Sequence, residues 1–128
     1  MYHNPVIIIE TDDWLKECRT FQEKFKIYNP IIITSKGNLN RLKLSKIFNP
    51  DSIFSNVKSH PTFESCQNGV KFSHNSSYDG VIAIGGGSVM DTAKAIMISH
   101  GTDLLEIREL IVFKDPFIRK LPSLFIPT

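Results

Sequence analysis

The chain has 128 residues, of which 41% are hydrophobic and 22% charged, and its formal net charge is +2. This is the composition of an ordinary soluble globular protein, and the length suits one domain with a single sizeable core. The small net charge and the scattered basic residues argue against a nucleic-acid partner. No apolar run approaches the ~20 residues that a helix needs to cross a bilayer, so we expect no membrane partner either.

The amino terminus and the cysteines bear on the cellular compartment. Residues 1–10 contain no basic region and no long apolar core, so we expect no secretion signal. Cys18 and Cys66 fall on the expected apolar faces of helices. We interpret them as reduced, buried thiols of a cytoplasmic protein, since nothing in the sequence requires a disulfide.

The first elements are a short apolar run and a helical stripe. Residues 5–10 contain Val-Ile-Ile-Ile and predict a strand. Residues 11–13, Thr-Asp-Asp, offer a helix start with negative charge in its first turn. The helix that follows is predicted by apolar residues at helical spacing, which we expect to face the core: Trp14, Cys18, Phe21 and Phe25.

A second strand and helix are predicted next. Residues 30–34 hold three isoleucines and indicate a buried strand. Residues 35–38, Ser-Lys-Gly-Asn, are typical of a turn, and a helix should follow to about Phe48. Its inward residues are expected to be Leu39, Leu42 and Ile47. Residues 52–57 predict a weaker strand.

The second half of the chain continues the alternation. Pro61 suits the first residue of a helix, with Phe63, Cys66 and Val70 on its inner face. Residues 80–84, Gly-Val-Ile-Ala-Ile, predict a strand, and a helix should run from the glycines after it to about Ser99, where Gly101 is a natural stop. The inner face of that helix is predicted to hold Val89, Ala93, Ile96 and Met97. A short helix over residues 103–110 and a strand over residues 123–126 complete the series.

Strands that alternate with helices predict an α/β fold with a mostly parallel sheet and helices on its faces. Continuous apolar strands such as residues 31–33 agree, because strands covered on both sides need no polar face. Residues 1–128 are therefore expected to form one domain. The sequence stops directly after an apolar strand, so we expect it to be a fragment of a longer protein.

The strongest feature is the run Gly85-Gly86-Gly87-Ser88 between a buried strand and a helix. Glycines let a ligand approach the main chain closely. The first turn of a helix has free amide hydrogens and partial positive charge, which together favour phosphate groups. Three glycines in this position therefore favour phosphate binding. The run is neither the dinucleotide motif G-x-G-x-x-G nor a Walker loop.

A structural alternative remains for the same segment. Ser88 and Asp91 have the spacing of a capping box, in which two side chains satisfy free amides of the helix start. Such a cap needs one glycine at most, so it does not account for Gly85, Gly86 and Gly87 together.

The whole motif from Gly85 to Lys94, Gly-Gly-Gly-Ser-x-x-Asp-x-Ala-Lys, resembles the cofactor loop of iron-containing alcohol dehydrogenases. Residues 31–36 resemble the early strand and adenosine-side turn of that family. Residues 57–62 resemble its Pro-Asn-Pro-Thr stretch, and residues 124–128 resemble the start of its Ile-Pro-Thr-Thr loop. Glycerol dehydrogenases and dehydroquinate synthases share the glycines but usually differ at the position of Ser88.

The resemblance implies a Rossmann-like three-layer domain that binds NAD or NADP, with a sheet that is mixed if edge strands run antiparallel. It implies a second, C-terminal domain, absent here, in which an aspartate and three histidines hold iron or zinc. In the full-length enzyme, hydride would pass between a small alcohol or aldehyde and the nicotinamide. We therefore expect no catalytic or metal-binding residue in this chain, and no dehydrogenase activity from the chain alone.

By the same resemblance, the amides around Gly86, Gly87 and Ser88 would hold the pyrophosphate, with Gly85 beside them and Asp91 close by. Thr128 would contact the cofactor near its phosphates. The remaining cofactor-binding positions implied by the family are Ser35 and His60.

Two positions depart from the family pattern. Ser35 stands where many NAD-using members have an aspartate, which would bond the ribose hydroxyls and repel a ribose phosphate. Serine beside Lys36 removes that repulsion and leaves both NAD and NADP open, although such a lysine is commonly a solvated one. Ser59-His60 replaces Pro-Asn, and histidine caps a helix less well than asparagine.

The histidines show no spacing typical of a metal site, so we interpret all of them as solvated or capping residues: His3, His60, His74 and His100. Two other functions stay open. The chain could be a stand-alone, non-catalytic nucleotide-binding or interaction module, whose exposed face would need a partner such as a second copy, which would make a homo-oligomer. A flavodoxin-type domain is weaker, because the continuation from Ser88 to Lys94 argues against it.

Overall fold

One sheet of five parallel strands organises the chain, for which the computed structural model describes residues 6–8, 13–57, 63–102 and 121–128. The strands lie side by side in the order β1-β5-β4-β2-β3, and every neighbouring pair is parallel. The predicted parallel sheet is confirmed, and among the described residues the recorded antiparallel pairing is an isolated bridge between Ser35 and Asn56. The strands are β1 (Val6–Ile8), β2 (Pro30–Thr34), β3 (Ile53–Phe54), β4 (Gly80–Gly85) and β5 (Ser123–Pro127).

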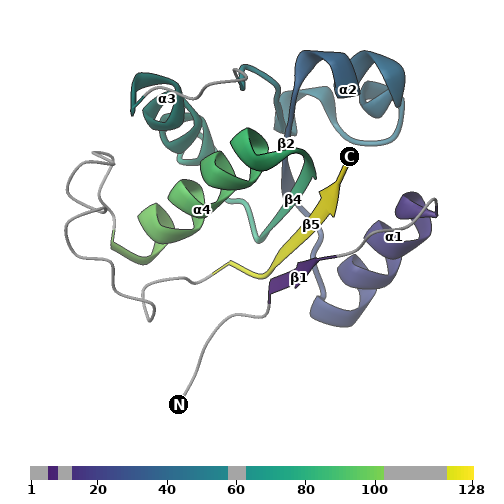
Figure 1. The fold of residues 1–128 in the computed structure, drawn as a ribbon. Helices are drawn as coiled ribbons and strands as arrows, with labels where there is room; N and C mark the ends of the chain where they lie inside the picture. The colour runs from purple at the N-terminus through teal and green to yellow at the C-terminus, as the bar shows by residue number, and fades with distance from the viewer. Residues whose placement is uncertain (1–5, 9–12, 58–62, 103–120) are drawn as a thin grey trace.

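The two faces of the sheet are buried under different helices. α1 (Trp14–Phe25) and α2 (Lys36–Arg41) lie on one face, and α3 (Phe63–Ser73) and α4 (Gly87–Thr102) lie on the other, as Figure 1 shows. The result is the predicted three-layer α/β architecture. Of the described helices, none combines the length and the apolar character that a membrane crossing needs.

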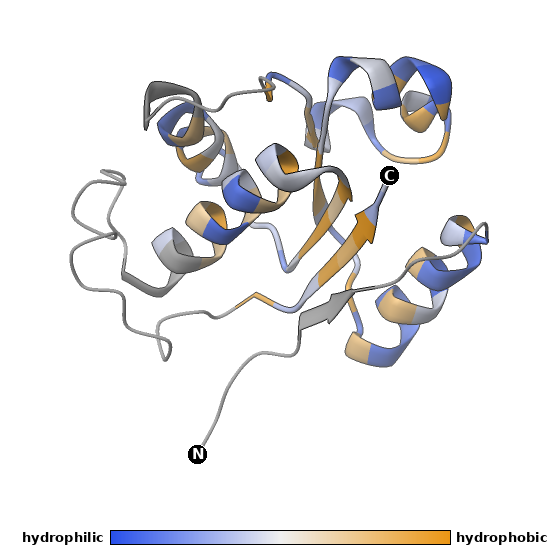
Figure 2. Cartoon of the chain, viewed as in Figure 1, coloured by the Kyte–Doolittle hydropathy of each residue, from blue (hydrophilic) through white to orange (hydrophobic). Residues whose placement is uncertain are grey.

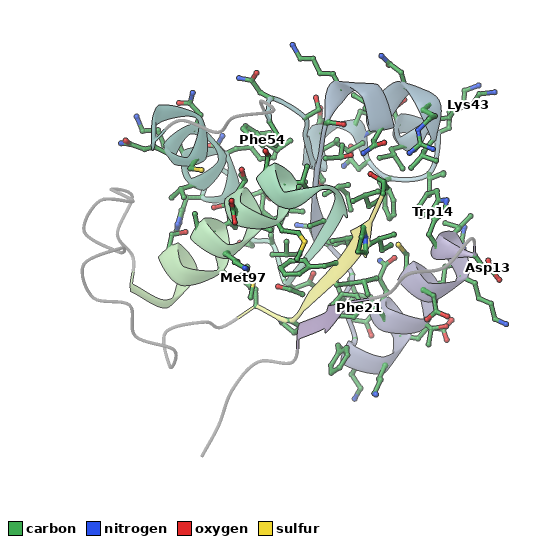
Figure 3. All side chains as sticks on the ribbon, in the orientation of Figure 1. Asp13, Trp14, Phe21, Lys43, Phe54 and Met97 are labelled. Atoms are coloured by element: carbon green, nitrogen blue, oxygen red, sulfur yellow. The ribbon has the colours of Figure 1, made fainter. Side chains whose placement is uncertain are left out.

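Side chains of successive strand residues alternate between the two apolar layers. Ile32 and Ile82 pack with α1, whereas Ile31 and Ala83 pack with α4. Figure 2 shows the orange strands at the centre and blue residues on the outer sides of the helices. In Figure 3, Phe21 and Met97 project from α1 and α4 on opposite sides of the sheet. The continuous apolar strands of the sequence are therefore strands covered on both sides.

α1 and α4 follow the predicted helical stripes closely. Cys18 and Phe21 of α1 are buried against the sheet, and α1 ends at Lys26, which takes the left-handed conformation with a φ of 55°. The predicted inner face of α4 is buried throughout, with exposed fractions of 3% or less at Val89, Ala93, Ile96 and Met97.

The prediction of a turn over residues 35–38 and of a long helix after it was wrong. Ser35 is the N-cap of α2, and its side-chain oxygen accepts a hydrogen bond from the amide of Asn38 at 3.2 Å. The helix lasts only six residues because Lys43 takes the left-handed conformation, with a φ of 51°. A single 3-10 turn, Leu44–Lys46, follows in its place.

Two other boundaries differ from the predictions, and two further predictions are not tested. The strand predicted over residues 52–57 is only two residues long. Gly101 lies inside α4 rather than ending it, since a helix tolerates a glycine at a cost of about 1 kcal/mol. The predicted helix start at Pro61 and the predicted helix over residues 103–110 lie outside the described residues.

Candidate functional site

The carboxyl ends of three neighbouring strands meet at one edge of the sheet. Thr34 of β2 is level with Ile84 of β4, and Gly85 of β4 is level with Pro127 of β5. The chain leaves β2 toward β3 on one side and leaves β4 toward β5 on the other. The border between β2 and β4 is therefore a topological switch point, where parallel sheets commonly bind ligands.

The three glycines that follow β4 have different surroundings. Gly85 has a φ of 155°, and a Cβ atom at this position would lie 2.6 Å from Cγ2 of Val89. Gly86 and Gly87 are exposed, and a Cβ atom at either would meet nothing within 4 Å. The fold therefore requires glycine at residue 85 but leaves open space at residues 86 and 87.

α4 begins immediately after this turn. The carbonyl oxygen of Gly86 accepts a hydrogen bond from the amide of Met90 at 3.1 Å, so Gly86 occupies the N-cap position. Ser88 and Asp91 lie too far into the helix to form the capping box that their spacing predicted. The alternative interpretation of this segment as a capping box is therefore wrong. The helix dipole places partial positive charge at this helix start, which makes it suitable for an anion.

Asn38 ties the ends of β4 and β5 to the start of α2. Its side-chain amide donates to the carbonyl of Ile84 at 3.4 Å and to Oγ1 of Thr128 at 3.3 Å. Its side-chain oxygen accepts from Arg41 at 2.7 Å, and the amide of Thr128 donates to the carbonyl of Gly85 at 3.2 Å. These bonds hold Thr128 beside the glycine turn.

Asn38 and Thr34 were not predicted as residues of this site. The side-chain hydroxyl of Thr34 donates to the carbonyl of Ile84 at 2.8 Å and is fully buried. The sequence feature that could have identified Thr34 is a polar residue at the end of an apolar run. Asn38 gave no signal beyond its preference for turns, because its partners lie 46 and 90 residues away along the chain.

The structure brings most of the predicted site residues to this edge. Ser35 is half-buried at the carboxyl end of β2, Ser88 is half-buried in the first turn of α4, and Thr128 is exposed at the end of β5. Asp91 is exposed on α4, more than one turn away from the glycines. His60 lies outside the described residues.

A cleft of about 370 Å³ opens beside the end of β5, between the start of α1 and the end of α2. Trp14 and Arg41 both line it, and Ile84, Ile126 and Thr128 are among the other lining residues. Trp14 was predicted to be a core residue. It packs against the core but is only partly buried, and Figure 3 shows it at the end of α1 nearest the end of β5. An aromatic ring and a guanidinium therefore flank the cleft next to the glycine turn.

The two thiols are not reactive groups of this edge. Both cysteines are free, as predicted, although Cys66 is only partly buried. Burial raises the pKa of Cys18 to about 12 and also raises the pKa of Cys66, so both thiols stay protonated at neutral pH. The Sγ atom of Cys66 lies 3.9 Å from Oγ1 of Thr92 on α4. These cysteines therefore have structural rather than nucleophilic surroundings.

The described part of the chain shows no group of three or more histidines, cysteines and acids arranged to hold a metal. His74 directly follows α3 and is partly buried, in keeping with the interpretation of a residue at a helix end, but its side chain also contacts α4. Its Nε2 atom lies 3.2 Å from Oγ of Ser99, and that hydroxyl donates to the carbonyl of Ile96 at 2.8 Å. His74 must then donate from Nε2, which joins the end of α3 to α4. His3, His60 and the side chain of His100 lie outside the described residues.

The sequence matches the family model of iron-containing alcohol dehydrogenases over residues 5–128. The chain belongs to the iron-containing alcohol dehydrogenase family. Its sequence is 37% identical to the lactaldehyde reductase of Escherichia coli K12 over 78 residues, which are 60% of this chain and 20% of that protein. It is 50% identical to a probable mitochondrial hydroxyacid-oxoacid transhydrogenase of Dictyostelium discoideum over 44 residues, which are 34% of this chain and 8% of that protein.

The fold is also that of solved alcohol dehydrogenase relatives. The sulfoacetaldehyde reductase of Bifidobacterium kashiwanohense, solved in complex with NAD+, superposes with a TM-score of 0.79 at 22% sequence identity. The match covers 99% of this chain and 35% of that one. This member of the iron-containing alcohol dehydrogenase family thus spans about a third of the length of a solved relative.

Proposed function

We propose that this chain binds a nicotinamide dinucleotide, NAD or NADP, at the carboxyl edge of its sheet. The observation that carries the proposal is the open space at Gly86 and Gly87, where a Cβ atom would meet no protein atom within 4 Å. A ligand that lies directly against the main chain explains why both positions lack a side chain. The family of the chain and the NAD+ bound by a relative of the same fold support a nicotinamide cofactor.

In this proposal the amides of Gly86, Gly87 and Ser88 hold the pyrophosphate, next to the conformation fixed by Gly85. The start of α4 supplies the partial positive charge. Thr128 contacts the cofactor near its phosphates, since its amide is bonded to the glycine turn. Asp91 lies further along α4, on the exposed side.

The adenosine half is proposed to lie toward β2 and β3, with His60 lining that side. Ser35 accepts a hydrogen bond from the amide of Asn38, which leaves its hydroxyl hydrogen for a ribose oxygen or a ribose phosphate. A serine here does not repel the extra phosphate of NADP as an aspartate would. Lys36 is exposed beside it. We therefore propose that both cofactors bind.

We further propose that the chain acts within a longer, NAD(P)-dependent alcohol or aldehyde oxidoreductase. The solved relative is about three times as long, since this chain covers 35% of it. Iron or zinc would be held by residues outside the described part of this chain. Among the described residues, no group of three or more histidines, cysteines and acids is arranged to hold a metal. When bound, such a metal polarises the alcohol oxygen. The described residues contribute binding and orientation of the cofactor.

The sole tryptophan of the chain, Trp14, provides a direct test because it borders the cleft beside Thr128. Reduced nicotinamide absorbs where tryptophan emits, so NADH or NADPH bound at this edge should quench Trp14 and gain sensitised emission. The expected result is saturable energy transfer that excess NAD+ displaces. The Trp14→Phe variant is the control and should lose the signal. Absence of saturable transfer in a chain shown to be folded by circular dichroism would refute cofactor binding.

A further inference from the structure

A second cleft, of about 340 Å³, lies on the α1 side of the sheet, away from the glycine turn. It is bounded by α1, by residues 47–49 and Ser52, and by the start of β2. Pro30 lines it at the first residue of β2, whereas the candidate cofactor site lies beyond the last residue of the same strand. The two sites are therefore at opposite ends of this strand.

Part of the lining of this cleft is apolar. Leu15 of α1 lines it, as do Ile47 and Phe48. All three side chains are partly buried, and Ile47 and Phe48 pack against the core. A surface of this kind suits the ring or hydrocarbon part of a small molecule.

Arg19 is the charged residue among those that line the cleft. Leu15, Arg19 and Gln22 lie at positions i, i+4 and i+7, so they form one stripe along α1. Arg19 is exposed, and no ion pair to it is recorded among the described residues. A guanidinium beside apolar side chains is suited to bind the carboxylate or phosphate of a ligand in two parallel hydrogen bonds.

Asn49 adds a hydrogen-bond donor to the lining of this cleft. The side-chain oxygen of Asn49 is occupied by the amide of Asp51 at 3.0 Å, so its NH₂ group remains to donate. Gln22 and Asn29 also line the cleft, but each already donates an amide hydrogen to a backbone carbonyl. Arg19 and Asn49 are therefore the two donors that an anionic group would use.

Tyr28 adds an exposed aromatic ring on a fixed backbone. It is the large apolar side chain that the described residues leave exposed, at 85% of its surface. Its amide donates to Asp79 at 2.7 Å, and the amide of Asn29 donates to the other oxygen of the same carboxylate at 2.9 Å. The ring is thus presented to solvent from a backbone that two hydrogen bonds hold in place.

We propose that this cleft is a second binding site, for a small aromatic anion. The ring of the ligand lies against Tyr28 and the apolar residues Leu15, Ile47 and Phe48, and its carboxylate or phosphate is bound by Arg19 and the side-chain NH₂ group of Asn49. The proposal goes beyond cofactor binding and does not depend on it, because no residue is shared between the two clefts.

Phenyl phosphate is a suitable probe, titrated into the isotope-labelled chain and followed by amide chemical shifts. We expect saturable shifts at Tyr28, Asn29 and Asn49. Arg19→Gln and Tyr28→Ala should each weaken binding about tenfold or more, because one removes the charge-assisted pair and the other the ring contact. Both residues are exposed, so both variants should stay folded, which circular dichroism checks.

Matched controls separate this site from the cofactor edge. Lys16→Gln removes a cation from an exposed position of the same helix that does not line the cleft, and should leave binding unchanged. Benzyl alcohol and inorganic phosphate, which each lack one half of the probe, should bind far more weakly. Three results would each overturn the proposal. Inorganic phosphate could bind as tightly as phenyl phosphate, or both cleft variants could bind phenyl phosphate as tightly as the natural chain. Alternatively, the chemical shifts could be confined to Gly86, Gly87 and Ser88. The last outcome would leave the proposed cofactor site intact.

Discussion

Gly85 differs from Gly86 and Gly87 in what a methyl group on its Cα atom would meet. A Cβ at Gly85 would clash with Val89 at 2.6 Å, and its φ of 155° is unfavourable for other residues. A Cβ at Gly86 or Gly87 would project into open space. The same substitution therefore separates the needs of the fold from the needs of a ligand.

We expect Gly85→Ala to lower the free energy of unfolding by about 2–3 kcal/mol. Gly86→Ala and Gly87→Ala should change it by less than about 1 kcal/mol but weaken NADH binding roughly tenfold or more. Urea unfolding and NADH titration of the same preparations measure both quantities. If Gly86→Ala were as destabilising as Gly85→Ala, the open space at residue 86 would not be real.

Asn38 is expected to hold the edge of the sheet together. Asn38→Leu removes the bonds to Ile84 and Thr128 and should cost about 1 kcal/mol of unfolding free energy. The amide of Thr128 should then exchange with solvent faster. Asn40→Leu makes the same chemical change at an exposed position of α2 and is the matched control. Equal effects of the two variants would show that the Asn38 bonds do not hold this edge.

Cys18 gives a pH dependence with a defined sign. Burial raises its pKa from 9.0 to about 12, so the folded chain holds the thiol proton more tightly than the unfolded chain does. Its contribution to stability is complete below about pH 9 and is lost as the pH rises toward about 12, by up to ~1.4 kcal/mol per pH unit. Urea unfolding from about pH 8 to about pH 11 should show a steeper loss for the natural chain than for Cys18→Ala. Parallel curves would contradict this assignment.

Among single residues, the sequence predicted the positions of those that belong to short motifs. The glycines, Ser88 and Thr128 belong to short motifs, so their place at a strand end or helix start could be inferred. Thr34 and Asn38 could not, because their hydrogen bonds join residues far apart along the chain.

The contact between α3 and α4 depends on a glycine inside a helix. A Cβ at Gly69 would lie 2.8 Å from Cγ2 of Thr92 and 3.3 Å from Cε2 of Phe54. In α2, a Cβ at Gly37 would meet only Oγ of Ser35, at 3.9 Å. We therefore expect alanine to have opposite effects on stability at Gly69 and at Gly37.

Gly69→Ala should lower the free energy of unfolding by about 1–2 kcal/mol, because overpacking outweighs the gain in helix propensity. Gly37→Ala has no such contact and should raise it by about 0.5–1 kcal/mol. Thermal and urea unfolding of both variants check the pair. A stabilising Gly69→Ala would mean that α3 and α4 are less closely packed than described.

Element types were predictable where the pattern was long or strongly apolar. The stripe of α1 and the runs of β2 and β4 left little choice, since each buries a continuous apolar surface. The elements of residues 35–48 were not predictable, because Lys43 takes the left-handed conformation and interrupts an otherwise helical pattern without a glycine at that position. Tertiary packing decides such a boundary.

At the scale of the whole molecule, alternating elements predicted a parallel sheet but not its strand order. The order places β4 between β2 and β5, and this arrangement makes the switch point next to the glycine turn. Sequence spacing contains no information on which strands become neighbours across such distances. The site therefore combines one motif visible in the sequence with an edge that only the fold assembles.

The most direct test of cofactor binding at this edge is an amide chemical-shift titration of the isotope-labelled chain with NADH. Our account predicts that the largest saturable shifts fall on Gly86, Gly87, Ser88 and Thr128. The amides that line the second cleft, such as that of Asn49, should stay unchanged. No shift at the glycine turn under saturating NADH, in a chain with the dispersed spectrum of a folded protein, would contradict the account.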